Sequence, residues 1–193
     1  MTMSSNMTTS IEFSRRRFLQ ASGGLLLAVN AAGSVYAQDK KFGADTMPGG
    51  TVDDPLVFLS IAADGTVTIV AHRAEMGTGV RTSLPMVVAD ELEARWDRVK
   101  VVQAPADEAR FGNQNVDGSR SVRHFLEPMR RVGAAARQML EAAAAARWSV
   151  PVAEVQAVQH EVLHRATGRR FGFGELAVDA AKQKVPATGE LRL

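Results

Sequence analysis

The chain has 193 residues, 46% of them hydrophobic, with 23 Lys and Arg against 21 Asp and Glu and no Cys. Without a thiolate, the chain cannot ligate zinc or an iron–sulfur cluster through sulfur, and it has no cysteine nucleophile. The near balance of charge gives no support to nucleic-acid binding.

The N-terminal segment has the ordered features of an export signal. Ser14–Gln20 reads S-R-R-R-F-L-Q, a twin-arginine pattern; a mildly apolar run over 21–32 follows, and 35–37 is a small-x-small cleavage site. The apolar run is far shorter than the ~20 residues of a membrane span. We expect residues 1–37 to be a twin-arginine signal peptide that directs the protein to the periplasm; the alternative is a disordered basic tail.

The positive charge belongs to this leader. Arg15, Arg16, Arg17 and Glu12 are its charged residues, which leaves 20 basic and 20 acidic residues from Gln38 onward. Residues 38–54 are rich in Gly, Asp, Lys and Pro and lack periodicity, so they are expected to form a linker. The remainder, 55–193, is long enough for one modest core.

A hairpin opens this domain, because β-rich runs at 56–61 and 66–70 flank an Asp64-Gly65 turn. Helical spacing of apolar residues predicts a helix that ends near Glu93, and the valines of 98–103 predict a strand.

A long irregular region over 104–121 is expected to be functional, since such loops are uncommon in compact domains. We predict that Pro128 opens a helix over 129–148. A short helix at 151–155, a hairpin beginning at 158 and a helix at 174–181 complete the prediction, and no closing element is expected after 182. The fold class is therefore α+β, with a mixed sheet and helices packed on one face.

The first candidate site is the turn Met76-Gly77-Thr78-Gly79, between a predicted strand and a predicted helix. Two glycines around one residue let the backbone approach a ligand closely. The helix that follows is expected to offer unpaired N–H donors to an anionic or oxygen-rich group. A purely structural turn is the alternative.

The second candidate site is the cluster Gly118-Ser119-Arg120-Ser121, which precedes the next predicted helix. The serines supply hydroxyl groups and Arg120 supplies a planar fork suited to phosphate or carboxylate. The alternative is a polar loop that only caps the helix near Glu127.

No catalytic residue and no metal ligand is predicted. The four histidines, His72, His124, His160 and His164, lack the H-E-x-x-H spacing of a zincin. Glu75 and Glu91 do not form a convincing acid–base pair by spacing alone.

The order of hairpin, E-M-G-T-G turn, helix, valine-rich strand, G-N-Q-N-V-D-G-S-R-S loop and long helix resembles a known family. It is similar to the molybdopterin-binding subunit of the xanthine dehydrogenase/aldehyde oxidase superfamily, of the isoquinoline 1-oxidoreductase beta-subunit type. The resemblance covers most of 55–193, which corresponds to the N-terminal part of such a subunit. It implies that Met76–Gly79 lie against the pterin, with Thr78 where relatives carry Gln, and that Gly118–Ser121 bind the pterin or phosphate region.

The resemblance also implies the cofactor, the reaction and the partner. The cofactor is molybdopterin, expected in its cytosine dinucleotide form. The reaction is oxidative hydroxylation of a small N-heterocycle or aldehyde, and electrons leave through a [2Fe-2S] subunit. Family subunits run several times longer and carry a catalytic glutamate near the far end, so this chain is expected to be inactive alone. A truncated, non-catalytic periplasmic domain is the alternative. If both loops bind one cofactor, they must open at the same edge of the sheet.

Overall fold

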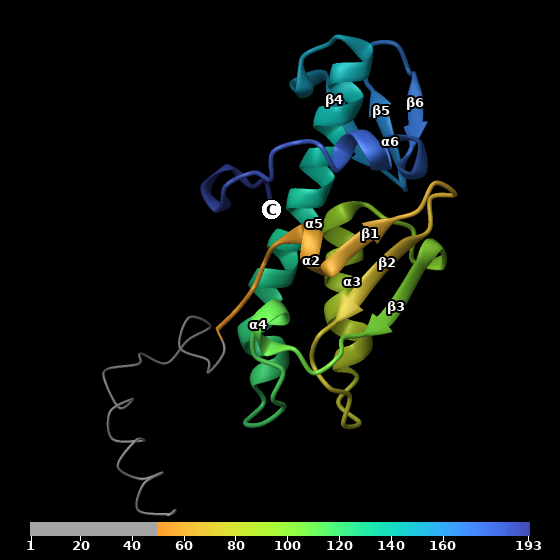
Figure 1. Ribbon diagram of the computed structural model, residues 1–193. Coiled ribbons are helices and arrows are strands. Elements are labelled where there is room, and N and C mark those ends of the chain that lie inside the picture. Colours follow the sequence, from red (N-terminus) through yellow and green to blue (C-terminus); the bar gives the residue numbers. More distant parts are fainter. Residues whose placement is uncertain (1–49) are drawn as a thin grey trace, which may run out of the picture. The chain divides into compact units, whose positions relative to one another are not determined.

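The computed structural model describes residues 50–193 (Figure 1). The predicted signal peptide and most of the predicted linker lie outside the described residues. The described end of the linker contacts the domain, because Thr51 forms a β-bridge with Gly112.

The first sheet contains three strands, β1 (Leu59–Ile61), β2 (Val67–Ala71) and β3 (Val99–Gln103), in the order β1-β2-β3. β1 pairs with β2 in the antiparallel direction, with Leu59 opposite Ile69. β2 pairs with β3 in the parallel direction, with Ile69 opposite Val101. The alternating burial of β2 places Val67, Ile69 and Ala71 on the face that packs into the core.

The strand expected over 56–61 is shorter than predicted. α2 (Pro55–Phe58) occupies its first half. The Asp54 carboxylate accepts a hydrogen bond from the N–H of Leu56 at 2.9 Å, and Pro55 holds the first helical position, where its missing N–H costs least. This cap and proline outweigh the β-preference of the residues that follow.

Two helices cover the inner face of this sheet. α3 (Val80–Leu92) confirms the predicted helix, and the short η2 (Trp96–Arg98) leads from it into β3. α4 (Glu108–Phe111) interrupts the region that was expected to be irregular. α5 (Arg120–Trp148) is the second covering helix and the longest of the described elements.

α5 begins eight residues before the predicted start, with Pro128 inside it rather than at its first turn. Phe125, Met129 and Val132 are fully or almost fully buried at helical spacing. Their burial against the core offsets the hydrogen bond that Pro128 cannot donate.

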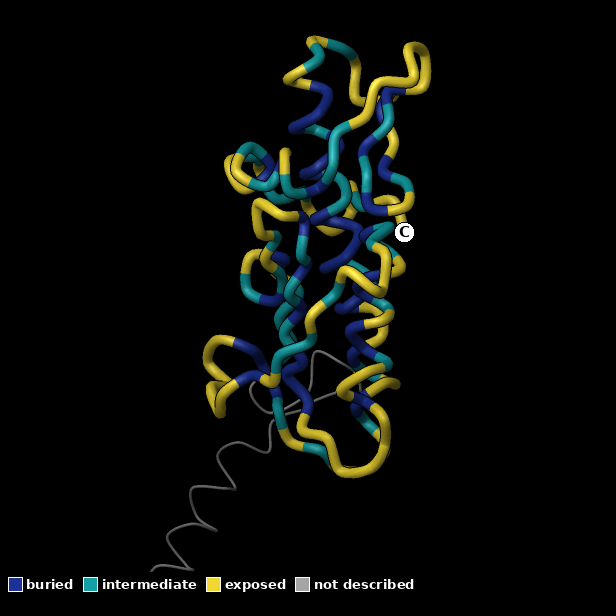
Figure 2. The backbone as a smooth tube through the Cα atoms, turned by 90° about the vertical axis from the view of Figure 1, so that its right-hand side faces the viewer, coloured by how far each residue is buried: buried dark blue, intermediate teal, exposed yellow. Residues whose placement is uncertain are grey.

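α3 and α5 pack closely at Gly133. A Cβ atom built there would lie 2.5 Å from the carbonyl oxygen of Val88, so only glycine permits this approach. The core spreads from this contact. It includes Phe58, Ile69, Leu84, Val88, Leu92, Phe125, Met129, Val132 and Leu140. Figure 2 shows buried positions along the helices and strands, and exposed positions mainly in the connecting loops.

A second, antiparallel sheet packs near the C-terminal part of α5. It is formed by β4 (Val155–Val158), β5 (Glu161–His164) and β6 (Arg170–Gly172). The 3₁₀ turn η3 (Val152–Glu154) takes the place of the predicted short helix, and α6 (Phe173–Ala180) confirms the last predicted helix. A 3₁₀ turn, η4 (Thr188–Glu190), lies in the tail where no element was expected.

The α+β class is confirmed, and the mixed sheet β1-β2-β3 carries its helices on one face. The antiparallel sheet β4-β5-β6 is an additional layer. Within residues 50–193, none of the helices combines the length and apolar character needed to cross a bilayer.

Candidate functional site

The two predicted loops line one cleft. The turn after β2 leads into α3, and the loop after α4 leads into α5; both helices begin at the lower end of the view in Figure 1. The cleft between the loops has a volume of about 480 Å³. It is lined by Met76, Thr78, Val80, Val116, Asp117, Gly118, Ser119, Ser121 and Val122.

Most of the predicted binding residues therefore meet, although the two loops are about forty positions apart in the chain. Of the eight predicted residues, Gly77, Gly79 and Arg120 do not line the cleft. Gly77 and Gly79 have positive φ values of 86° and 74°, and Cβ atoms built on them would meet nothing within 4 Å. The glycines shape the turn, and their open Cα faces leave room for close approach.

The rim of the cleft is apolar. Met76 is 70% exposed and Val122 is 44% exposed, and both line the cleft. Its deeper wall is polar, since Ser121 is buried there. The cleft thus presents an apolar entrance in front of hydroxyl and backbone groups.

Two of the N–H donors at the start of α3 are not free, which corrects the sequence-based expectation. The Glu75 carboxylate accepts hydrogen bonds from the N–H groups of Gly79 and Arg81, each at 3.0 Å. These bonds, that of Arg81 first, hold the pKa of Glu75 below its ordinary value. An acidic side chain of the chain itself therefore occupies the place where an anionic ligand was expected.

The start of α5 differs in this respect. Ser119, the N-cap residue of α5, has a left-handed backbone with φ 55°, and its side chain caps no N–H group. The guanidinium of Arg120 lies 3.8 Å from the Asp117 carboxylate. The positive end of a 29-residue helix therefore faces the cleft without a capping side chain.

Arg73 joins the two loops from behind the cleft. Its side chain is 1% exposed, and it lies just after β2. Nη1 donates to both the backbone oxygen and Oδ1 of Asn113 at 2.6 Å, and Nη2 donates to the backbone oxygen of Asn115. Nε donates to the hydroxyl oxygen of Ser121 at 3.3 Å.

Within residues 50–193, no carboxylate is in direct contact with this buried arginine. Its guanidinium stacks 4.5 Å from the centre of the Phe125 ring. Burial lowers the pKa of Arg73 from its ordinary value, and the more distant charges of Asp117 and Glu108 act in the opposite direction. The group stays charged at neutral pH, so it contributes a fixed positive charge behind Ser121.

His72 lies beside Arg73 in an aromatic environment. Its ring contacts Phe58 and Phe125, with centroids 5.2 and 4.7 Å away. Nε2 is buried and has no hydrogen-bond partner among the described residues. Burial, assisted by the Arg73 charge, lowers the pKa of His72 to about 3, so the ring is neutral at physiological pH.

Gln114 anchors the second loop from the other side. Its Nε2 donates to the backbone oxygen of His72 at 3.2 Å and to that of Pro105 at 2.8 Å. Its Oε1 accepts from the N–H of Asp107. Gln114 and Arg73 together hold the long loop against the end of β2.

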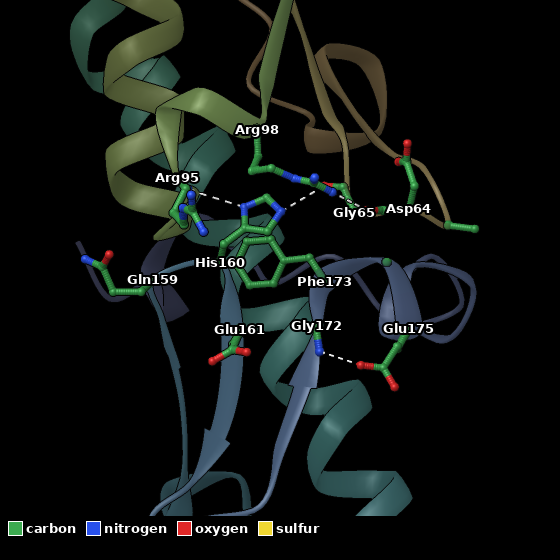
Figure 3. Close-up of a pocket in the computed structure, with 12 residues that line it drawn as sticks. Asp64, Gly65, Arg95, Arg98, Gln159, His160, Glu161, Gly172, Phe173 and Glu175 are labelled. Atoms are coloured by element: carbon green, nitrogen blue, oxygen red, sulfur yellow. Dashed lines mark hydrogen bonds between the residues drawn. The ribbon is translucent and has the colours of Figure 1, made fainter.

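A larger cavity of about 600 Å³ lies between the two sheets (Figure 3). His160 sits in its centre: its ring contacts the oxygen of Gly65 at 2.8 Å and the N–H of Arg95 at 3.3 Å, and it packs against Phe173.

The charged groups of this cavity are engaged with neighbours of their own. Arg95 pairs with Asp97, Arg98 donates to the oxygen of Asp64, and Glu161 pairs with Arg170. The Glu175 carboxylate accepts from the N–H of Gly172. None of the predicted site residues lies here, so this cavity is a junction between layers rather than the candidate site.

In the part of the chain that the structure describes, no group of three or more His, Asp or Glu side chains is arranged to hold a metal ion. The cleft accordingly presents hydrogen-bonding and apolar groups rather than metal ligands.

Arg73 and the capping role of Glu75 were not predicted from the sequence. Both residues lie next to the predicted glycine turn. The feature of the sequence that could have indicated them is a charged residue directly after a buried strand. Gln114 was part of the motif that carried the family resemblance, but no role was assigned to it.

The described residues form an α+β domain in which the turn of a βαβ unit meets the start of a long helix at a cleft. The chain belongs to the molybdopterin cofactor-binding domain family, whose model matches residues 11–192.

Curated relatives agree with this assignment. The chain is 39% identical over 173 residues to isoquinoline 1-oxidoreductase subunit beta of Brevundimonas diminuta, which covers 86% of this chain and 22% of that protein. It is 31% identical over 169 residues to a membrane-bound aldehyde dehydrogenase (pyrroloquinoline-quinone) of Gluconacetobacter polyoxogenes, with coverage of 84% and 21%. The chain thus spans about a fifth of the length of these relatives.

Solved structures show the same fold. Quinoline 2-oxidoreductase from Pseudomonas putida 86 matches with a TM-score of 0.51 at 18% identity, over 68% of this chain and 17% of that one. A Cu,Mo-CO dehydrogenase matches with a TM-score of 0.50 at 21% identity, over 62% of this chain and 15% of that one.

Proposed function

We propose that the cleft between Met76–Val80 and Val116–Val122 forms part of a molybdopterin site in a molybdenum hydroxylase subunit. The observation that carries the proposal is the meeting of the two loops in one cleft. Membership of the molybdopterin cofactor-binding domain family supplies the class of ligand.

The residues present fit such a group. A pterin is a flat heterocycle with an oxygen-rich side chain, and it needs both apolar contact and hydrogen-bond donors. Met76 and Val122 provide exposed apolar surface at the rim. The Ser121 hydroxyl provides a donor deeper in the cleft, and the start of α5 contributes the positive end of the helix dipole.

The residues of this chain bind and orient the cofactor. When bound, molybdopterin with its metal supplies the oxidative hydroxylation of an electron-poor carbon, and the protein contributes positioning and electrostatics. The substrate class we propose is a small N-heterocycle or an aldehyde, in line with the names of the two curated relatives. We further propose the cytosine dinucleotide form of the cofactor and a [2Fe-2S] partner subunit.

The relatives are about five times longer than the matched region, so the described domain is proposed to supply one wall of the site. We propose that this chain alone binds the cofactor weakly and oxidises no substrate. Its location is proposed to be the periplasm, because the leader carries paired arginines before a weakly apolar run.

A pair of glycine substitutions tests the site. Gly79 has a left-handed backbone and lies between Thr78 and Val80, which both line the cleft, so Gly79→Val should strain the turn and displace these two residues. Gly168→Val is the matched control, because Gly168 also has a positive φ, 71°, and open space around its Cα. Both variants bear the same kind of backbone strain, and only Gly79→Val bears it between two residues that line the cleft.

Binding is measured by equilibrium dialysis against metal-free molybdopterin under anaerobic conditions, with bound pterin detected by fluorescence. We expect Gly79→Val to lower the affinity at least tenfold and Gly168→Val to change it less than twofold. Equal affinity in all three proteins, or no binding by the unmodified chain, would contradict the proposed site.

A further inference from the structure

We propose that Arg73 is a positioning residue that turns the Ser121 hydroxyl into a hydrogen-bond donor aimed at the cleft. This inference rests on the proposed function, because it concerns how the same cleft meets its ligand. Arg73 itself is buried behind the cleft wall and does not line the cleft.

The direction of the hydrogen bond carries the argument. A guanidinium group has only donors, so the Ser121 oxygen must be the acceptor in its contact with Nε of Arg73. A hydroxyl group that accepts in this way keeps its own proton for another acceptor. No acceptor for that proton is recorded among residues 50–193, and Ser121 lines the cleft. The proton is therefore available to an oxygen or ring nitrogen of a ligand.

The remaining donors of Arg73 hold the loop that leads into α5 and Ser121. They bind Asn113 and Asn115, and the guanidinium plane rests on Phe125, one turn beyond Ser121 in α5. These contacts leave the guanidinium little freedom to rotate. Ser121 thus faces a donor whose position is set by the 113–115 loop and by Phe125 of α5.

The charge of Arg73 adds to this effect. No carboxylate lies within ion-pair distance of its guanidinium among the described residues, and Asp117 and Glu108 act on it only at longer range, which is unusual for a buried arginine. A positive charge behind a hydroxyl polarises the O–H bond and strengthens the bond that it donates. The arrangement selects for a ligand atom that accepts, such as a phosphate, carbonyl or pterin oxygen.

Lysine cannot replace Arg73 in this role. An ammonium group keeps the charge but has no planar fork, so it cannot reach Asn113, Asn115 and Ser121 together. Arg73→Lys therefore separates the geometric effect from the charge. Ser121→Ala removes the proposed donor and leaves the Arg73 side chain in place.

The test is a double-mutant cycle on binding of metal-free molybdopterin, measured by equilibrium dialysis. We expect Ser121→Ala to weaken binding about threefold to tenfold, the range of one neutral hydrogen bond. Arg73→Lys should weaken binding by at least as much. On the Ser121→Ala background, Arg73→Lys should weaken binding by a clearly smaller factor than it does in the unmodified chain, because the part of its effect that acts through Ser121 is gone.

Hydrogen exchange supplies a readout that needs no ligand. Amides of 113–121 should exchange at least tenfold faster in Arg73→Lys than in the unmodified chain, whereas Ser121→Ala should leave 113–117 unchanged. Arg137→Lys is the matched control: Arg137 is also largely buried and donates to backbone oxygens of Glu91 and Arg192, away from the cleft.

The outcomes separate the two proposals. Additive losses in the cycle would overturn the role of Arg73 in orienting Ser121, while the binding site itself would stand. Unchanged exchange over 113–121 in Arg73→Lys would overturn its role in holding the loop. No binding by the unmodified chain would contradict the proposed function and the donor role of Ser121, and hydrogen exchange would still decide the role of Arg73 in the loop.

Discussion

Oε1 of Glu75 accepts a hydrogen bond from the backbone N–H of Gly79 at 3.0 Å. The acidic residue and the glycine turn are therefore one structural unit, and the turn contains its own anion. A ligand that approaches this side of the cleft meets the shape of the turn rather than a set of free donors. The polar recognition we propose comes instead from the α5 side.

Glu75→Gln tests this capping. Both carboxylate oxygens of Glu75 accept hydrogen bonds, whereas the amide of Gln has one oxygen and one NH₂ group, which cannot accept. The variant should therefore melt at a lower temperature than the unmodified chain near pH 7. The pKa of Glu75 is lowered in the folded protein, so its stabilisation is present above its ordinary pKa of 4.5 and is lost as the pH falls further. The difference in Tm should therefore shrink below pH 4.5.

Glu127→Gln is the control for this comparison, since Glu127 is an exposed residue whose ion pairs to Arg130 and Arg131 are 3.8 and 3.5 Å long. It should change Tm very little at any pH. A Glu75→Gln variant as stable as the unmodified chain at pH 7 would show that the cap is not significant.

His72→Phe tests the neutral, buried histidine. The pKa of His72 is about 3 when folded and 6.5 in its ordinary state, so the folded form binds fewer protons. Stability should thus fall below pH 6.5, by up to about 1.4 kcal/mol per pH unit. Phenylalanine does not titrate and suits the contacts with Phe58 and Phe125.

The measurement is urea unfolding at pH 7 and pH 4.5. When the pH falls from 7 to 4.5, the free energy of unfolding of His72→Phe should decrease by about 2–3 kcal/mol less than that of the unmodified chain. The other three histidines are present in both proteins, so their titration cancels. Parallel pH dependence of the two proteins would contradict the assignment.

Gly133→Ala tests the contact between α3 and α5. The new Cβ would lie 2.5 Å from the oxygen of Val88 and 3.2 Å from the nitrogen of Leu92, both backbone atoms. Separating the helices should cost about 1–3 kcal/mol or more, despite the better helix propensity of alanine. Gly189→Ala, where nothing lies within 4 Å of the built Cβ, should be close to neutral in the same thermal melts.

The leader gives a prediction about location. Replacing Arg15 and Arg16 with Lys keeps the charge and removes the twin-arginine pattern. We expect the double variant to stay in the cytoplasm as the precursor, while the unmodified chain reaches the periplasm and begins at Gln38. Fractionation followed by N-terminal sequencing measures both outcomes, and equal periplasmic yield would rule out this route.

Much of the sheet β1-β2-β3 and of α3 could be predicted, because the turn residues and the apolar periodicity of the sequence agreed with the tertiary packing. The Asp64-Gly65 turn, the helix ending near Glu93 and the strand that became β3 combine clear turn chemistry with clear periodicity. The α5 start could not be placed correctly, because Pro128 is a usual helix opener. Only the burial of Phe125 against the core decides in favour of the longer helix.

The site could be predicted in part for a similar reason. Glycines and serines near helix starts are visible in the sequence, and the structure brings both loops to one cleft. Arg73 and Glu75 act over specific distances that depend on how the loops fold back, so spacing along the chain does not reveal them. The contact between Arg73 and Ser121 joins positions that are 48 residues apart.

The most direct test of the central claim is a map of the ligand contact by NMR. Metal-free molybdopterin is titrated into the isotope-labelled chain under anaerobic conditions, and backbone amide shifts are followed. The account predicts that the largest shifts fall within 76–80 and 116–122, around the cleft. Shifts confined to the larger cavity, at 63–65, 159–161 and 172–175, or no shifts at millimolar ligand, would contradict it.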